Sequence, residues 1–204
     1  DIIETSINEK PRFIEQDDIS LIYMGTLSER SQEIAIQKLK PYAEEIREKI
    51  EKNQLFLFTG NSVELLGKYI ENEDGSKIEA LGIFDIYAKR NMMNRHNSFF
   101  LGKYKDIEIL GFKSQFTMLY GNNEKNYFIE TNMGIGINEQ TKLEGIHQNN
   151  FFATYVIGPF LVLNPYFTLE LLKLMGVENP KLAFESEVLE AYNIRLKKFK
   201  TIEN

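Results

Sequence analysis

The first third of the chain alternates short apolar runs with a long amphipathic stretch. Residues 19–24 and 55–58 are apolar runs of strand length, and each leads directly into a turn. Between them, residues 31–52 place apolar side chains at helical spacing, with charged side chains on the opposite face. A sharp turn at residues 59–62 then leads into a further apolar helix. This order of strand, helix, strand, turn and helix predicts a parallel sheet with helical crossovers.

The middle of the chain has a different pattern, in which short runs alternate apolar and polar positions. Residues 78–137 contain several such runs, 105–112 and 126–131 among them, separated by turn signals such as Gly-Asn-Asn. We interpret these runs as added strands that are partly antiparallel. The sequence therefore predicts the α/β class, with three layers: a mostly parallel sheet flanked by helices, and an added, partly antiparallel strand region.

The last part of the chain returns to longer apolar patterns. Residues 151–157 form another strand-like run, which stops at Gly158-Pro159. Amphipathic helices are expected after it, at residues 165–175 and 182–199. No repeat or low-complexity stretch interrupts the sequence, so we expect one α/β unit.

The amino-acid composition argues against several classes of function. A formal charge of −6, from 24 Lys and Arg against 30 Asp and Glu, disfavours nucleic-acid or membrane-surface binding, which a basic face would support. The absence of cysteine excludes disulfides, thiolate metal sites and thiol nucleophiles. Apolar runs are too short for membrane insertion, and no signal peptide is visible. We expect a cytoplasmic bacterial protein without a cofactor or metal; whether a segment precedes Asp1 stays open.

Three local patterns then follow one another along the chain. The first, residues 21–32, is a strand followed by Gly-Thr-Leu and a polar stretch ending in Gln. The second, residues 55–68, is a strand followed by Thr-Gly-Asn-Ser-Val-Glu-Leu-Leu-Gly-Lys. The third joins Glu-Gly-Ile-His at residues 144–147 to Ala-Thr-Tyr-Val-Ile-Gly-Pro at residues 153–159.

Together these patterns resemble the class I glutamine amidotransferases of the cobyric acid synthase-like family, and most closely the glutaminase subunit of lipid II isoglutaminyl synthase. The resemblance implies a flavodoxin-like fold over residues 1–176. Residues 177–204 lie outside it and are expected to form a C-terminal helical extension, packed on the same domain or on a partner. A role in peptidoglycan or cobalamin synthesis would rest on this resemblance alone.

The resemblance also shows that the two reactive residues are absent. The family pattern is Cys-Gly-Gly-aromatic-Gln-Leu-Leu-Gly at the nucleophile, and here Gly60 occupies the cysteine position, with Asn61 and Ser62 at the glycines. In the third pattern the family has a His that acts as general base, and Ile157 occupies its position. Glycine has no side chain to become a nucleophile and isoleucine cannot carry a proton, so no catalytic residue is intact.

Some of the residues that the family places around its substrate are also present in this sequence. The family has a glycine triplet whose backbone N–H groups help to form an oxyanion hole, and here only Gly25 remains, followed by Thr26 and Leu27. Arg95 aligns with an arginine expected to contact the carboxylate of glutamine. A family Glu-Asn-His run after Gly-Phe is replaced by Lys-Ser-Gln at residues 113–115. We take Gly25, Thr26, Asn61, Ser62 and Arg95 as the candidate substrate-binding residues.

Two other side chains near the empty position are candidates for a substitute nucleophile. Thr59 and Ser62 flank the empty position and carry hydroxyls, which need a neighbouring base to attack an amide. The two histidines, His96 and His147, both lie away from the family's base position, and we expect a solvated loop at the first and a structural hydrogen bond at the second.

Three hypotheses follow from these residues. The leading one is a catalytically degenerate, non-hydrolytic binding or regulatory subunit, with a Mur-ligase-like or cobyric-acid-synthase-like synthetase as partner and glutamine or a related small molecule as ligand. The alternative is an active glutamine amidotransferase with displaced or partner-supplied catalytic groups, so whether any activity remains stays open. The third is a purely structural subunit that docks through its C-terminal helix.

Overall fold

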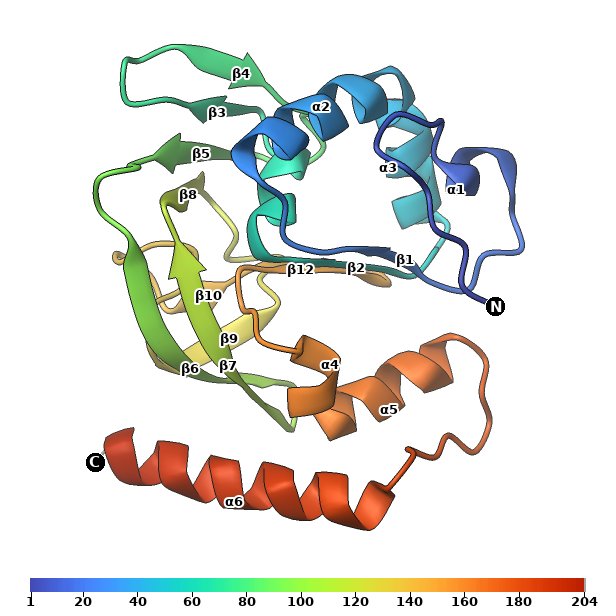
Figure 1. Ribbon diagram of the computed structural model, residues 1–204, viewed down its shortest axis with the longest axis vertical. Helices are drawn as coiled ribbons and strands as arrows, with labels where there is room; N and C mark the ends of the chain where they lie inside the picture. The colour runs from blue at the N-terminus through green and yellow to red at the C-terminus, as the bar shows by residue number, and fades with distance from the viewer. Residues whose placement is uncertain (204) are drawn as a thin grey trace.

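A computed structural model, which describes residues 1–203, places the predicted parallel strands at the centre of the molecule (Figure 1). Strands β1 (Ile22–Met24), β2 (Phe56–Thr59) and β12 (Phe151–Thr154) lie side by side and parallel, in the order β1-β2-β12. Strand β11 (Ile146–Gln148) adds to the far edge in antiparallel orientation. Because the carboxyl ends of parallel strands meet at one edge of a sheet, the turns after β2 and β12 come together there.

Helices cover both faces of this sheet. One face carries α2 (Glu29–Leu39), the 3-10 turn η1 (Lys40–Tyr42) and α3 (Ala43–Glu51), with the short helix α1 (Arg12–Glu15) beside them. The single helix expected over residues 31–52 is therefore wrong, because Pro41 has no N–H for a helical hydrogen bond and the chain breaks at η1.

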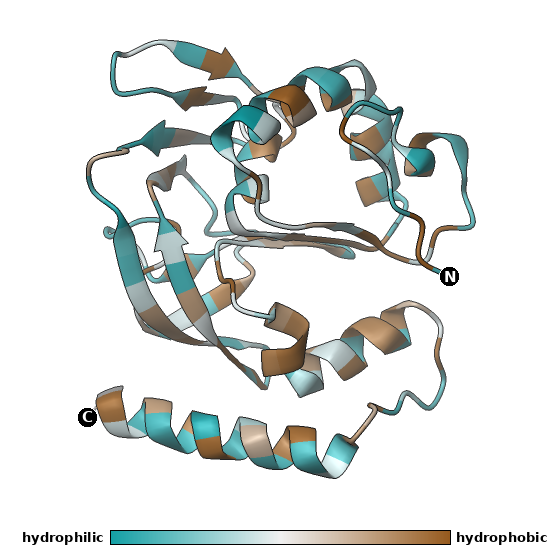
Figure 2. Ribbon diagram, in the orientation of Figure 1, coloured by the Kyte–Doolittle hydropathy of each residue, from teal (hydrophilic) through white to brown (hydrophobic). Residues whose placement is uncertain are grey.

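The other face of the sheet carries α4 (Phe160–Leu163) and α5 (Pro165–Leu174). The strand expected over residues 151–157 ends at Thr154, three residues earlier than predicted. The segment after the elbow, η2 (Gly60–Leu66), is a 3-10 helix rather than the expected α-helix, and nearly all of it is buried. In Figure 2, α4 is coloured almost entirely as apolar.

The added strands are confirmed and form two further four-stranded sheets. One has the order β10-β9-β6-β7, and the other has the order β4-β3-β5-β8. Their bounds are β3 (Tyr69–Glu71), β4 (Lys77–Glu79), β5 (Ile86–Arg90), β6 (His96–Tyr104), β7 (Ile107–Gln115), β8 (Thr117–Gly121), β9 (Ile129–Met133) and β10 (Leu143–Glu144). Among the described residues, three strand pairings are parallel and six are antiparallel. The α/β class is confirmed, with a more extensive antiparallel part than the sequence pattern indicated.

Two of the expected strands differ in their bounds. The run at residues 105–112 begins within a hairpin turn, because Lys105 has a positive φ of 52° and the strand starts only at Ile107. The run at residues 126–131 becomes β9, which starts three residues later, at Ile129.

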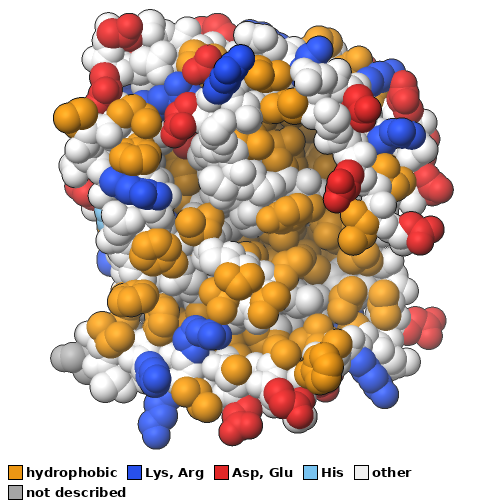
Figure 3. All heavy atoms as spheres, viewed as in Figure 1, with side chains coloured by type: hydrophobic (Ala, Val, Ile, Leu, Met, Phe, Trp, Pro, Cys, Tyr) orange, Lys and Arg blue, Asp and Glu red, His pale blue; other side chains and the backbone are white. Residues whose placement is uncertain are grey.

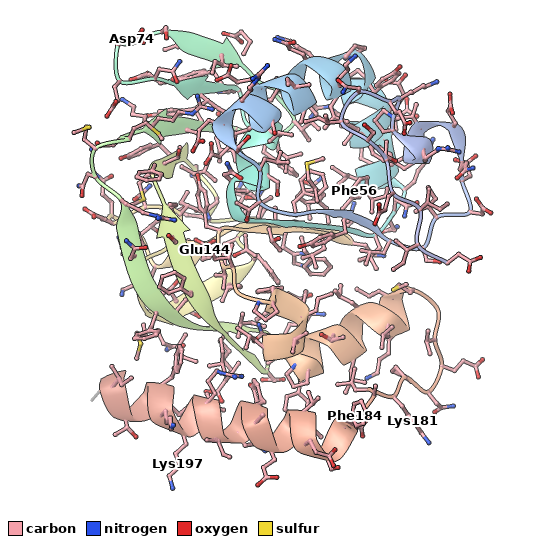
Figure 4. The ribbon with its side chains drawn as sticks, in the orientation of Figure 1. Phe56, Asp74, Glu144, Lys181, Phe184 and Lys197 are labelled. Atoms are coloured by element: carbon pink, nitrogen blue, oxygen red, sulfur yellow. The ribbon has the colours of Figure 1, made fainter. Side chains whose placement is uncertain are left out.

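Aromatic side chains fill the core on both sides of the parallel sheet. Phe56 and Phe151, on neighbouring strands, lie 5.7 Å apart between their ring centroids and face helices α2 and α3 (Figure 4). On the opposite face, Phe152 packs 5.4 Å from Phe167 of α5. Burying both faces of the strands in this way accounts for their continuous apolar sequences.

The C-terminal extension forms α6 (Glu185–Glu203) and packs on the antiparallel strands β6 and β7 of the same chain. The Tyr192 hydroxyl donates a 2.8 Å hydrogen bond to the Glu108 carbonyl, and the ring of Phe199 lies 5.4 Å from that of Phe99. Within residues 1–203, no helix has the length and apolar character to cross a membrane.

Candidate functional site

The turn from β2 into η2 has the shape of a nucleophile elbow. Gly60, its first residue, has φ +68°, a conformation that glycine adopts readily and other residues rarely adopt. A Cβ placed on Gly60 would lie 3.0 Å from the Cβ of Thr26, and the Thr26 hydroxyl would be nearer still. The position that holds the nucleophile in the sequence pattern is therefore bare and faces the side chain of Thr26.

The loop after β1 is joined to the elbow by a pair of hydrogen bonds. The backbone N–H of Leu27 donates to Oδ1 of Asn61, and Nδ2 of Asn61 donates to the Leu27 carbonyl, both at 2.8 Å. At the first residue of this loop, a Cβ on Gly25 would lie 3.2 Å from the Tyr23 hydroxyl. The structure thus brings Gly25, Thr26 and Asn61 together around Gly60.

The hydroxyl groups beside Gly60 are engaged in structural contacts. Ser62 is fully buried, and its hydroxyl donates to the carbonyls of Thr59, at 2.8 Å, and Met24, at 3.1 Å. The Thr59 hydroxyl lies 3.2 Å from the Tyr23 hydroxyl. Neither contact supplies a base, so the geometry gives these hydroxyls no activation toward an amide.

Ile157 follows the strand beside the elbow. Thr154 is paired with Thr59 across β12 and β2, so the segment after β12 leaves the sheet next to Gly60. The N–H of Ile157 donates to the Phe112 carbonyl at 2.8 Å, and the Phe112 N–H donates back at 3.2 Å. The position of the general base therefore holds an aliphatic side chain whose backbone is fixed against β7.

Both histidines make local contacts elsewhere. The ring of His147 stacks on Phe152 with 4.4 Å between centroids, and its Nδ1 lies 3.1 Å from the Phe151 carbonyl. Burial lowers the pKa of His147, which favours the neutral ring. The solvated loop expected at His96 is wrong, because His96 begins strand β6 and is partly buried. Its Nε2 lies 2.9 Å from the Ser98 hydroxyl. These contacts give each histidine a structural role.

The comparisons with known proteins agree with this geometry. The model of the CobB/CobQ-like glutamine amidotransferase domain matches residues 3–165. The chain belongs to this family. The resemblance described from the sequence is thereby confirmed.

Two similar relatives carry the name lipid II isoglutaminyl synthase (glutamine-hydrolyzing) subunit GatD. The one from Staphylococcus aureus (strain N315) is 27% identical over 174 residues, which covers 85% of this chain and 70% of the relative. The one from Streptococcus pneumoniae (strain ATCC BAA-255 / R6) is 26% identical over 156 residues, covering 74% of this chain and 58% of the relative. This chain therefore spans only part of the length of these proteins.

A solved structure supports the fold. A crystal structure of a glutamine amidotransferase matches with a TM-score of 0.53 and 14% sequence identity, covering 78% of this chain and 80% of that one. At this identity the likeness shows the α/β fold alone.

Beneath the elbow of this amidotransferase domain lies a buried polar cluster that the sequence reasoning missed. Nε2 of Gln32 donates to Oε2 of Glu64 and to the Asn61 carbonyl, both at 2.8 Å. The Tyr155 hydroxyl donates to Oε1 of Glu64 at 3.0 Å. Burial raises the pKa of Glu64 to about 7, although both hydrogen bonds favour the charged form. The signal was available, because Glu64 stands where the family pattern has Gln.

Arg90, at the end of β5, extends this cluster toward the neighbouring sheet. Its guanidinium donates to Oε1 of Gln32 at 2.7 Å and to Glu33 at 3.1 Å. Because Gln32 bridges Arg90 and Glu64, the cluster joins α2, η2, β5 and the segment just after β12 beneath the elbow.

A buried ion pair includes Lys113, which stands where the family pattern has the Glu-Asn-His run. Nζ of Lys113 lies 2.6 Å from Oε2 of Glu144, and both side chains are fully buried (Figure 4). Oε1 of Glu144 accepts from the Thr154 hydroxyl at 2.9 Å and from the Tyr155 N–H at 2.8 Å. Burial lowers the pKa of Lys113, opposed by its attraction to Glu144. Through these contacts Glu144 holds the end of β12, just before Ile157, the residue at the general-base position of the sequence pattern.

Arg95 is placed apart from these contacts. It lies exposed in the segment between β5 and β6, with its guanidinium 5.1 Å from the ring centroid of Phe116. Its role in binding a carboxylate stays a prediction. Among residues 1–203, no group of three or more His, Cys, Asp or Glu side chains is arranged to hold a metal ion.

Proposed function

We propose that this chain is a non-hydrolytic member of the glutamine amidotransferase family that serves as a binding or regulatory subunit of a synthetase assembly. The observation that carries the proposal is Gly60 at the elbow: the turn keeps its positive φ while the side chain that would attack glutamine is missing. Ile157, which cannot exchange a proton, supports it independently.

The relatives suggest the kind of partner. Each is named as a subunit of a glutamine-hydrolysing synthase, which implies a second, synthetase subunit for this chain as well. By the resemblance described above, the partner is a Mur-ligase-like protein and the pathway is peptidoglycan synthesis.

The surface of the domain supports a protein partner. Figure 3 shows apolar side chains gathered across the middle of the face that carries α4 and α5. Tyr23 of β1 is 59% exposed and Val162 of α4 is 66% exposed. Apolar side chains gathered on one face are typical of protein interaction surfaces.

The decisive test is release of glutamate from glutamine, measured with the purified chain alone and with the synthetase recovered from native extract by an affinity pull-down. We expect no release in either sample, while the Staphylococcus aureus relative, named as glutamine-hydrolysing, serves as positive control. Turnover by the chain alone that disappears in Ser62→Ala or Thr59→Ala would overturn the proposal. Turnover only with the partner present would favour the alternative, an active enzyme completed by partner groups.

A further inference from the structure

The loop that should stabilise an oxyanion and the turn that should carry the nucleophile are in direct contact. The Thr26 side chain lies over Gly60, at the place where the first side-chain atom of a nucleophile would start. In an active amidotransferase this space must hold both the nucleophile and the amide carbon that it attacks, with the reacting atoms about 3–3.5 Å apart. Here a side chain of the protein already fills it.

One backbone hydrogen-bond donor of the same loop, the Leu27 N–H, is also occupied. A developing oxyanion is stabilised by backbone N–H groups that are free to point at it. The Leu27 N–H instead donates to Asn61, and the Leu27 carbonyl accepts from the same side chain, so the loop is held at both polar groups. Asn61, which replaces a family glycine in the elbow, therefore accepts a hydrogen bond from the Leu27 N–H, a group that the reaction would need for the oxyanion.

We propose that Thr26 is a built-in plug of the nucleophile position, locked in place by Asn61, which closes this site to glutamine and to other primary amides. This inference rests on the non-hydrolytic function proposed above and deepens it, because it states that the site is sealed as well as unreactive. Its consequence is that restoring the cysteine alone cannot reopen the site: the new side chain would collide with Thr26.

The absence of cysteine provides a clean probe, since any introduced thiol is the single one in the chain. The variants are Gly60→Cys, Thr26→Gly, the double variant, and Glu73→Cys as an exposed control. For each we would measure the rate of alkylation by iodoacetamide and the equilibrium constant of unfolding in urea. Thr26→Gly alone corrects for the extra chain entropy of a glycine, and the double-mutant cycle isolates the contact between the two sites.

We expect the thiol of Gly60→Cys to react at least about tenfold more slowly than that of the double variant, which should approach the rate of Glu73→Cys. We also expect Gly60→Cys to raise the unfolding constant roughly tenfold more in the presence of Thr26 than in its absence. Equal labelling rates together with additive stability effects would refute the plug.

The outcomes also separate this inference from the proposed function. Glutamate release by the unmodified chain would overturn the proposed function and the plug together, since a sealed site cannot turn over glutamine. If the two substitutions have additive effects on stability and equal labelling rates, and the wild-type chain releases no glutamate, the plug is overturned and the proposed function still stands. If the double variant fails to fold, Gly60→Ala in the presence of Thr26 or of Thr26→Ala tests the same collision with smaller changes, because Thr26→Ala removes the hydroxyl that lies nearest to Gly60.

Discussion

The side chain of Glu64 should make the free energy of unfolding depend on pH. It is fully buried beneath the elbow and stands where the family pattern has an uncharged Gln. The perturbation is Glu64→Gln, which preserves the shape of the side chain and removes its titration. Because the pKa rises from 4.5 to about 7 on folding, the folded chain keeps a proton that the unfolded chain releases between these pH values.

The sign of the effect follows from this proton. A carboxyl group whose pKa is raised in the folded state favours folding at low pH, and this contribution is lost as the pH rises from 4.5 to about 7. At about 1.4 kcal/mol for each tenfold change in proton affinity, the loss amounts to about 3 kcal/mol and is complete above pH 7. Glu64→Gln abolishes this loss.

The loss of one hydrogen bond offsets part of the stability that Glu64→Gln gains at high pH. The carboxylate accepts from both Gln32 and Tyr155, whereas the amide has a single oxygen and must turn its NH2 group toward one of these donors. This mismatch costs about 1 kcal/mol. We therefore expect the variant to be about 2 kcal/mol more stable than the wild type at pH 8 and nearly equal to it at pH 5, where the wild type has already lost about 1 kcal/mol.

Urea unfolding at pH 5, 6, 7 and 8 measures both curves, and Glu73→Gln, at an exposed position, is the matched control. The control should follow the wild type at every pH. A difference between Glu64→Gln and wild type that stays constant from pH 5 to pH 8 would refute the reasoning, because it would mean that Glu64 does not take up a proton on folding.

Three further predictions concern other buried contacts. Asn61→Ala leaves the N–H and carbonyl of Leu27 without their partner, and urea unfolding should show a loss of about 1–3 kcal/mol. Lys113→Met leaves Glu144 as a buried, unpaired charge and should cost about 3–5 kcal/mol, much of it recovered when Glu144→Gln is added; full additivity of the two changes would contradict the pairing. Tyr192→Phe removes one hydrogen bond to β7 and should lower the stability by about 1 kcal/mol, with a larger loss showing that α6 is held differently.

The parallel part of the fold could be predicted from the sequence because its strands are short, continuous apolar runs. The run at residues 55–58 became β2, displaced by a single residue, since burial on both faces leaves no polar position to obscure it. The long helix failed at Pro41, where the hydrophobic spacing continues although the backbone hydrogen bonding cannot. The spacing of hydrophobic residues indicates which side chains face the core, but it does not reveal a break in the helical hydrogen bonds of the backbone.

The site was predictable to the extent that it depends on residue identity. Gly60 and Ile157 were placed at the nucleophile and general-base positions from the sequence pattern alone, and this assignment stays a prediction. The contact between Thr26 and Gly60 could not be predicted, since it depends on how closely the loop after β1 approaches the turn after β2. Arg95 shows the same limit: its identity suits a carboxylate, whereas its contact with Phe116 appears only in the structure.

The elbow and the loop after β1 together explain how this turn keeps an unusual backbone conformation without a side chain at Gly60. A positive φ costs about 1–2 kcal/mol for a residue with a Cβ and little for glycine, so Gly60 removes the strain that a nucleophile would impose. The space released by the missing side chain is taken by Thr26, and the two hydrogen bonds of Asn61 fix the loop there. Each change makes the other favourable, because Thr26 needs the space that Gly60 leaves and fills what would otherwise be a void. These contacts stabilise the turn without a side chain at the nucleophile position.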